Sequence, residues 1–392
     1  MILTRNFVFK LICFRSYTVT VDKGQFYFTQ CRLFASKKAR KDKKTMIKQW
    51  KQKNLVTEPE CPEQRVFSGI QPTGAIHLGN YFGAIQKWVE LQDGGWKTIF
   101  SIVDHHAMTI PQDPKKLHSN IMELTATLLA CGIDPKRSIL FQQSMVPRHC
   151  ELLWVISCNA TVARLAHFPQ YKEKSASLQE VPVGLYTYPL LQTADILLYK
   201  ATHVPVGEDQ VQHLQLTQHL AQRFNKRYGS TFPIPQVILT GGSSSKIRSL
   251  RNPSSKMSKS EVDVRGRLQL SDPPEVLRDK VRKAVTDCTS AVTFEPESRP
   301  GVANLIVMHS LSSGKSPEEI CLAAQGLDTG RYKMVVADAI INKLQPIREK
   351  ILHYMSRQNE LTEILEEGSQ KAAAIAEVTW NEVRSKIGIK IS

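Results

Sequence analysis

Apolar positions follow two alternating spacings between residues 66 and 225. Short apolar runs typical of buried strands are each followed by a longer stretch in which apolar residues recur at helical spacing. The predicted strands are 66–70, 97–104, 138–143 and 202–207, and the predicted helices are 81–92, 117–132, 188–199 and 208–225. Alternating strands and helices predict an α/β fold with a Rossmann-like, doubly wound parallel sheet. Ligands of such sheets bind over the carboxyl ends of the strands.

The pattern changes after about residue 270, where only helical spacing remains. We therefore predict three parts. They are a basic leader over 1–60, a Rossmann-like catalytic domain over 61–269, and an α-helical domain over 270–392.

The leader carries most of the positive charge. The formal net charge of the chain is +16, and residues 1–57 contribute +12 because they hold 14 Lys and Arg against Asp22 and Asp42. An acid-free start that mixes basic, hydroxyl and apolar residues is typical of a mitochondrial transit peptide, and Lys10 interrupts the apolar core that a secretory signal needs. A disordered basic tail that touches RNA is the alternative. We expect a protein of the mitochondrial matrix.

Two classes of protein are disfavoured by the composition. No run reaches the roughly 20 apolar residues of a membrane span, so no membrane partner is expected. The eight cysteines form no CxxC pair and no Cys/His cluster with zinc-ligand spacing. A structural metal site is therefore not predicted.

The segment SGIQPTGAIHLGNYFGAI, residues 68–85, joins the first predicted strand to its helix. A helix start near His77 would offer unpaired amide groups and a positive dipole end to a phosphate. Gly74 and Gly79 leave space for a ribose or base close to the backbone. His77 could donate a hydrogen bond to a phosphate oxygen. For this pattern alone, a tight turn with a surface histidine carries equal weight.

A second basic motif, KMSKS, occupies residues 256–260 at the end of a loop rich in Gly, Ser and Lys. Lys256 and Lys259 could neutralise a triphosphate as its charge moves toward a leaving pyrophosphate. Taken alone, such a sequence is more often an exposed basic loop.

Together the two motifs resemble the paired signature of class I aminoacyl-tRNA synthetases. The segments GIQPTGAIHLGNYFGAI, YPLLQTADILLY, VPVGEDQVQH and KMSKS also stand in the order and spacing of the tryptophanyl-tRNA synthetase family. The resemblance covers about residues 66–390, and with its basic leader the chain is similar to the mitochondrial form.

The resemblance implies an ATP site made from distant segments, with Mg²⁺ as the accompanying cation. It assigns catalytic roles to His77, Asn80, Lys256 and Lys259. The ATP-binding positions that it implies are Gln71, Pro72, Thr73, Gly79, Asn80, Gly207, Glu208, Asp209, Ile247, Lys256, Met257, Ser258, Lys259 and Ser260.

The resemblance also places Asp195 where the family has a carboxylate that accepts the indole N–H of tryptophan. Indole has one donor and no acceptor, so an acceptor-only side chain selects it. A buried carboxylate left unpaired is costly, which would reject phenylalanine. The alternative, an ordinary helix acid, is disfavoured by the apolar setting TADILLY. The other pocket positions implied are Phe67, Tyr188, Gln192, Val204, Val206, Gln210 and His106, and a structural role for His106 is an equal alternative.

The implied activity has two steps. ATP activates L-tryptophan to tryptophanyl-adenylate with release of pyrophosphate, and the amino acid is then transferred to tRNA(Trp) by a homodimer. The helical domain is expected to meet the anticodon region, and Lys280, Arg282, Lys283, Arg331 and Lys333 are candidate phosphate contacts, with a solvated surface as an equal alternative. The rival functions are a tyrosyl-tRNA synthetase, a non-tRNA adenylyltransferase of the HxGH type, and an inactive RNA-binding protein.

The chain departs from the family pattern at a few positions. Bacterial members usually have Thr at position 77, and many follow KMSKS with Asp-Pro where this chain has Glu261-Val262. After VGEDQ the common pattern is QHxELTRD, whereas this chain has Gln215, Gln218 and His219. These departures put local salt bridges and interface details in doubt, but not the activity class.

Overall fold

The computed structural model describes residues 17–22, 25–30, 64–166, 168, 180–240, 247–259, 261 and 263–390. The chain divides into two compact units, Met1–Glu60 and Cys61–Ser392. In the first unit, β1 (Tyr17–Asp22) and β2 (Gln25–Gln30) pair antiparallel, a hairpin that the sequence analysis did not anticipate in the leader. The rest of the leader lies outside the described residues, and the transit peptide stays a prediction.

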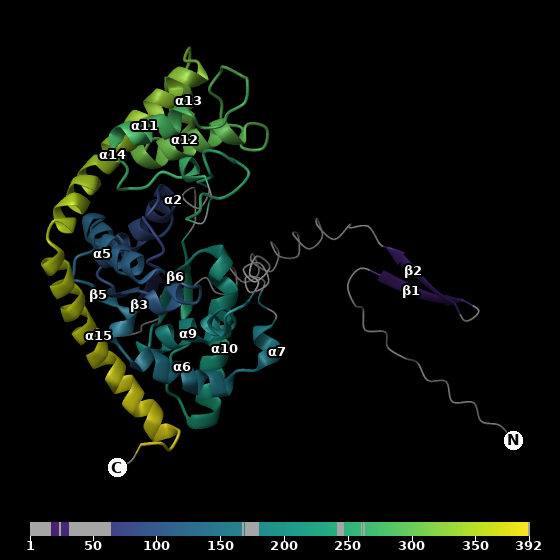
Figure 1. Cartoon of the computed structure of the whole chain (residues 1–392), viewed down its shortest axis with the longest axis vertical. Helices are drawn as coiled ribbons and strands as arrows, with labels where there is room; N and C mark the ends of the chain where they lie inside the picture. Colours follow the sequence, from purple (N-terminus) through teal and green to yellow (C-terminus); the bar gives the residue numbers. More distant parts are fainter. Residues whose placement is uncertain are drawn as a thin grey trace. The chain divides into compact units, whose positions relative to one another are not determined.

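Five parallel strands of the second unit form one sheet in the order β5-β4-β3-β6-β7 (Figure 1). The strands are β3 (Arg65–Ile70), β4 (Lys97–Ile102), β5 (Ile139–Gln142), β6 (His203–Val206) and β7 (Gln236–Leu239). The chain runs outward from β3 to β5, then returns to the other side of β3 for β6 and β7. The predicted doubly wound α/β fold is therefore confirmed, and its switch point lies between β3 and β6. Strand β7 was not predicted.

Helices fill the connections between the strands. They are α2 (Leu78–Asn80), η1 (Tyr81–Ile85), α3 (Gln86–Asp93), α4 (Asp104–Ala107), α5 (Pro114–Ala130), η2 (Gln143–Met145), α6 (Arg148–Asn159), α7 (Val162–Leu165), α9 (Val183–Leu198), η3 (Glu208–Gln210) and α10 (Val211–Tyr228). Helix α5 begins where the sequence favours it, because the Asp113 carboxylate accepts the Lys116 N–H and Pro114 occupies the first turn. Helices α6 and α7 were not predicted.

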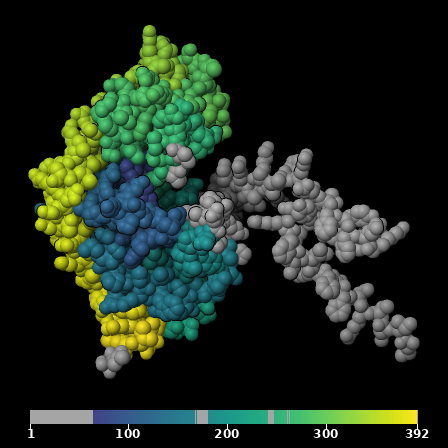
Figure 2. All heavy atoms as spheres, viewed as in Figure 1, coloured from purple at the N-terminus to yellow at the C-terminus, as the bar shows by residue number. Residues whose placement is uncertain are grey.

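The C-terminal region is helical, as predicted. Its elements are η5 (Val264–Gly266), α11 (Pro274–Arg282), α12 (Pro300–Ser313), α13 (Pro317–Ala323), α14 (Thr329–Met355) and α15 (Gln358–Lys386). Helix α14 packs on α5, and α15 returns along β5, where a Cβ on Gly368 would collide with the Leu140 carbonyl. In Figure 2 the yellow C-terminal residues lie directly against the blue residues of the sheet region. The contacts group residues 61–392 into one compact unit, and the division into two domains at residue 269 stays a prediction.

One apolar core runs from the sheet into the C-terminal helices. It joins Trp88 and Phe100, whose rings stack at 4.6 Å, to Leu277, Val336 and Leu361. Across the described part of the chain, no helix combines the length and the apolar character needed to cross a membrane.

Candidate active site

The turn after β3 ends in a capped helix, with His77 as the N-cap residue of α2. The His77 Nδ1 accepts the Asn80 N–H at 3.2 Å, and the Asn80 side-chain oxygen accepts the His77 N–H at 3.4 Å. The His77 side chain is buried, so the alternative of a surface histidine is wrong. Gly79 keeps this arrangement open, because a Cβ there would come 3.1 Å from the His77 ring. Gly74 has a φ of +110°, a value that favours glycine.

The amide groups of this helix start are less available than the sequence suggested. The Leu78 N–H donates to the Leu268 carbonyl at 2.8 Å, and the Asn80 N–H is taken by His77. The expectation of unpaired amides is therefore wrong at Leu78, because the segment 268–270 pairs with this turn, and at Asn80, because His77 caps the helix locally. A phosphate here would depend on side chains more than on these two amides.

The lysine loop lies against the first motif. The Lys259 ammonium donates to the Gln71 carbonyl at 3.2 Å, and the Leu270 N–H donates to the Ile76 carbonyl at 2.9 Å. Two segments about 180 residues apart are thus joined by direct hydrogen bonds, as the motif pair implies. Ser260 lies outside the described residues.

Two predicted nucleotide contacts anchor the lysine loop in the core. Ile247 and Met257 are each 1% exposed, and the Met257 N–H donates to the Ile247 carbonyl at 3.2 Å. A nucleotide would therefore meet the backbone of these residues. Ser258, between Met257 and Lys259, is half-buried, whereas Lys256 is exposed.

Burial lowers the pKa values of two groups here. Burial, together with the charges of Lys259, Arg267 and Lys256, lowers the pKa of His77 to about 3. His77 is therefore neutral at pH 7, and because its Nδ1 accepts a hydrogen bond, its proton lies on Nε2. Burial lowers the pKa of Lys259 to about 8, although the Glu123 carboxylate opposes the shift.

A cavity of about 670 Å³ opens beside the two motifs. Its walls come from the turn after β3, the start of α5 and the lysine loop, and include Thr73, Lys116, Glu123, Lys259 and Arg267. Its volume is that of an ordinary ligand site, and its three cationic side chains suit a polyphosphate. Pro72, in the same turn, is buried.

The segment Gly207, Glu208 and Asp209 follows β6, next to β3. A Cβ on Gly207 would come 2.8 Å from the Asp209 Oδ1, so glycine allows this turn. Among the residues that line the cavity, none comes from this segment. It lies at the carboxyl edge of the sheet.

Asp195, on α9, is 1% exposed, and its carboxylate accepts three hydrogen bonds of 2.7 Å. The donors are His106 Nε2, His149 Nδ1 and Gln143 Nε2. The Tyr199 hydroxyl bonds to His149 Nε2 at 2.8 Å from the other side. Asp195 is thus the centre of a buried polar network, and not an ordinary helix acid.

The network keeps the Asp195 carboxylate ionised. Burial raises its pKa, but hydrogen bonds from His106 and His149 outweigh burial and leave the pKa below its ordinary value. Among the described residues, Oδ1 accepts from His149 and Gln143, whereas Oδ2 accepts from His106 alone. One acceptor position on Oδ2 therefore remains.

Aromatic residues enclose this network. The Phe67 and Tyr199 rings stack at 5.3 Å, and the Tyr188 ring meets the His106 ring edge-on at 6.5 Å. The Tyr188 hydroxyl bonds to His213 Nε2 at 2.8 Å. The structure thus brings four predicted pocket residues together, namely Phe67, His106, Tyr188 and Asp195. The remaining predicted positions lie on neighbouring elements, namely Gln192 on α9, Val204 and Val206 on β6, and Gln210 in η3.

The comparisons with known proteins agree with this geometry. The model of the family "tRNA synthetases class I (W and Y)" matches residues 60–345. The chain belongs to this family. The synthetase is 45% identical over 327 residues to the tryptophan–tRNA ligase of Caldanaerobacter subterraneus, covering 83% of this chain and 98% of the relative. It is 44% identical to the tryptophan–tRNA ligase of Wolinella succinogenes, covering 83% and 99%.

Solved structures give the same result. Tryptophanyl-tRNA synthetase from Mycoplasma pneumoniae superposes on the synthetase with a TM-score of 0.73 at 30% identity, covering 84% of this chain and 98% of that one. The Campylobacter jejuni tryptophanyl-tRNA synthetase complexed with ADP and tryptophan superposes with a TM-score of 0.73 at 31% identity. The match covers 83% of this chain and 99% of that one.

Sequence reasoning missed several residues of the synthetase site. Gln143 and His149 follow β5, and polar residues at the end of a predicted strand were the available signal for Gln143. Arg267 lies beyond KMSKS, where its Nη1 donates to the Lys259 and Glu261 carbonyls at 3.0 and 2.7 Å. Nothing in the local sequence marks Arg267 as a residue that holds the lysine loop.

The five basic side chains predicted as tRNA contacts in the helical region all make ion pairs or hydrogen bonds within the protein. Lys280 is buried in an ion pair of 2.6 Å with Asp272, so its prediction as a phosphate contact is corrected. Arg282 and Lys283 both pair with Asp279, and Arg331 pairs with Asp328. The Lys333 ammonium donates to the Ala284 carbonyl at 2.8 Å, and burial lowers its pKa.

Proposed function

We propose that this synthetase activates L-tryptophan with ATP and charges tRNA(Trp) for mitochondrial translation. In the first step the carboxylate of tryptophan attacks the α-phosphate of ATP, and pyrophosphate leaves. In the second, a ribose hydroxyl of the terminal adenosine of the tRNA attacks the adenylate. The names of relatives at 40–45% identity support this substrate.

The observation that carries the choice of amino acid is the bonding of Asp195. Its carboxylate is ionised, buried and acceptor-only, with one acceptor position left on Oδ2. An indole N–H fills that position without bringing an acceptor of its own. A phenylalanine ring offers no donor, which leaves the position unpaired at a cost of about 1–3 kcal/mol.

Activation needs no protein nucleophile. The cavity beside the lysine loop would hold the triphosphate, with Lys259, Arg267 and Lys116 as its cations. The neutral His77 keeps an Nε2 proton for donation. Lys256 and Lys259 would stabilise the charge that develops on the leaving pyrophosphate, and positioning with electrostatic stabilisation supplies the rate.

Mg²⁺ fits this site as a companion of ATP. Mg²⁺ is usually bound by substrate phosphates together with one or two carboxylates, and Asp113 and Glu123 line the cavity. When bound, the ion would neutralise phosphate charge. The residues of this chain would bind and orient the triphosphate.

The homodimer and the mitochondrial location are parts of the same proposal. Trp154 and Val183 expose 72% and 76% of their surface, and both lie between β5 and β6. Exposed apolar side chains of this kind support an interface. Sedimentation at micromolar concentration should give a dimer, and a monomer alone would contradict it. For the location, residues 1–60 fused to a reporter should direct it into mitochondria, and a cytosolic reporter would contradict it.

The test of the activity is amino-acid-dependent ATP–pyrophosphate exchange with each standard amino acid in turn. The proposal predicts exchange with tryptophan alone, followed by charging of tRNA(Trp). Exchange with tyrosine would overturn the assignment of the pocket. Exchange with no amino acid, in a folded protein, would favour a non-tRNA adenylyltransferase or an RNA-binding protein.

A further inference from the structure

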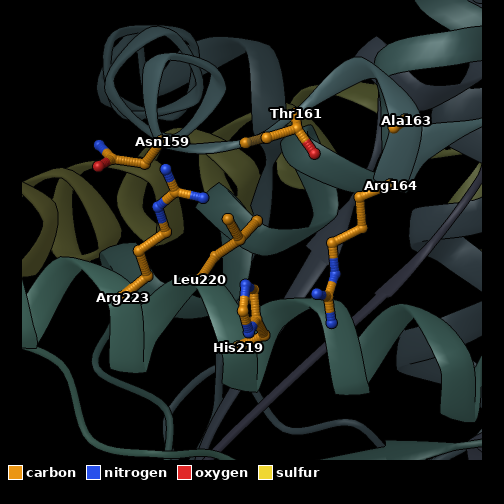
Figure 3. A pocket seen from close by; sticks show the side chains of 8 residues that line it. Asn159, Thr161, Ala163, Arg164, His219, Leu220 and Arg223 are labelled. Carbon is orange, nitrogen blue, oxygen red and sulfur yellow. The ribbon is translucent and has the colours of Figure 1, made fainter. Parts of the chain in front are cut away.

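A second basic hollow lies between the end of α6, α7 and α10. It has a volume of about 320 Å³ and shares no lining residue with the cavity beside the lysine loop. Figure 3 shows Arg164 of α7 and Arg223 of α10 on either side of His219. Asn159 and Thr161 close the upper wall. Two guanidinium groups and an imidazole, from α7 and α10, thus line one hollow.

The positive charge of this hollow is not compensated within the described part of the chain. No carboxylate there forms an ion pair with Arg164 or Arg223, whereas Arg137, Arg148 and Arg278 each pair with an acid. Burial, followed by the charges of Arg164 and Arg223, lowers the pKa of His219. Like charges held together without an anion repel one another, so an anionic ligand would be stabilised here.

The hollow continues along α10. A neighbouring hollow of about 390 Å³ shares Arg164 and is lined by Phe168, Gln212, Gln215 and Leu216. The α10 residues that line the two hollows recur every three or four positions from 212 to 223, so they form one helix face. This face spans about 16 Å, which is longer than a single phosphate ion. An extended anion with apolar parts fits it better than a free ion.

We propose that this face of α10, together with Arg164, binds the phosphodiester backbone of the tRNA. Arg164 and Arg223 would each hold one phosphate group by charge-assisted hydrogen bonds, and His219 would donate one N–H. In the family pattern that the chain resembles, position 218 is an arginine and position 219 an aspartate, whereas this chain has Gln218 and His219 there. The inference rests on the proposed function for the identity of the RNA.

The test compares tRNA charging with tryptophan-dependent ATP–pyrophosphate exchange, which needs no tRNA. The double variant Arg164→Gln/Arg223→Gln should raise the KM for tRNA about tenfold. The slope of log(kcat/KM) for tRNA against the logarithm of the salt concentration should become shallower by about 2. His219→Asp should weaken charging in the same direction, because it supplies a neutralising carboxylate without removing an arginine. Exchange should be unchanged in all of these variants, which also establishes that they are folded.

The matched control is Lys87→Gln/Lys136→Gln, which removes two cations that lie outside α10 and line neither hollow. Its KM for tRNA should change less than twofold, and a loss as large as that of the pocket variants would overturn the site. An unchanged KM in the pocket variants would also overturn it. If the intact enzyme charges no tRNA, the proposed function itself fails and the inference with it.

A second arm separates RNA from free anions. Tripolyphosphate is added, and the shift in Tm is measured for the intact enzyme and for Arg164→Gln/Arg223→Gln. A shift that the variant loses, combined with an unchanged KM for tRNA, would assign the hollow to a free anion and contradict the proposal.

Discussion

Lys259 reaches the nucleotide cavity from a loop, half-buried and with a pKa near 8, whereas Asp195 lies on helix α9, 1% exposed and held by three donors. The first side chain is fixed to the other motif by one described hydrogen bond, to the Gln71 carbonyl. The second is fixed from α4, η2 and α6 at once. The two halves of the site therefore differ in how firmly the chain holds their charged groups.

The proposed function gives each half a different task. During activation, charge moves from the triphosphate to the leaving pyrophosphate, and the cations of the lysine loop would stabilise that charge. Discrimination between amino acids needs an acceptor that is held in place by its other hydrogen bonds. An amino acid without a matching donor then leaves a buried acceptor position without a hydrogen bond, which costs free energy. We infer that rate depends chiefly on the lysine loop and selectivity chiefly on the Asp195 network.

The largest effect should come from Lys256→Ala/Lys259→Ala. Loss of both loop cations removes transition-state stabilisation and should lower kcat for tryptophan-dependent exchange by about 10³-fold or more. The KM for tryptophan should hardly change. Lys226→Ala, an exposed lysine of α10, is the control, and near wild-type exchange by the double variant would contradict the role of the loop.

Asp195→Asn should act on selectivity. The amide brings donors to a place where His106, His149 and Gln143 already donate, so kcat/KM for tryptophan should fall about 100-fold and stability by about 1–3 kcal/mol. Asp338→Asn, at an exposed ion pair with Arg278, should cost less than about 1 kcal/mol. The ratio of kcat/KM for tryptophan to that for phenylalanine does not depend on the fraction of enzyme that is folded. A ratio equal to that of the intact enzyme would show that Asp195 does not select indole.

The pH dependence of ATP use should reveal Lys259. Its pKa of about 8 lies below the ordinary lysine value, so the ammonium loses its proton as pH rises through 8. The kcat/KM for ATP reports the free enzyme and should fall above pH 8, approaching about tenfold for each further pH unit. In Lys259→Arg, the kcat/KM for ATP should no longer decrease above pH 8, because a guanidinium stays charged there. A pH profile equal to that of the intact enzyme would assign the titration to another group.

Tyr199→Phe should have the smallest effect. It removes the hydroxyl that bonds to His149 Nε2, so unfolding free energy should fall by about 1–3 kcal/mol while kcat/KM for tryptophan changes only a few-fold. The control is Tyr228→Phe, whose hydroxyl makes no hydrogen bond to the described residues. Equal Tm values for the two variants would mean that the Tyr199 hydroxyl does not support the network.

Short motifs singled out two parts of this site, the turn and helix after β3 and the lysine loop, on physical grounds. Asp195 came from the resemblance to the family, and physical reasoning about the indole N–H was then consistent with it. Periodicity also predicted the parallel sheet, because each strand and helix has its own spacing.

Long-range contacts escaped prediction for a common reason. The pairing of segment 268–270 with the His77 turn, the return of α15 to β5, and the approach of Gln143 and His149 to Asp195 depend on tertiary packing. Nothing in the spacing of those segments encodes their partners. The occupied amide of Leu78 was mispredicted for this reason, whereas the amide of Asn80 is occupied by the local His77 cap.

The most direct test is exchange kinetics with tryptophan and phenylalanine for the intact enzyme, Asp195→Asn and Lys259→Ala side by side. We predict that Lys259→Ala lowers both rates and keeps their ratio, while Asp195→Asn collapses the ratio toward one. A Lys259→Ala enzyme with a collapsed ratio, or an Asp195→Asn enzyme that keeps it, would contradict the division between a loop that sets rate and a buried network that sets selectivity.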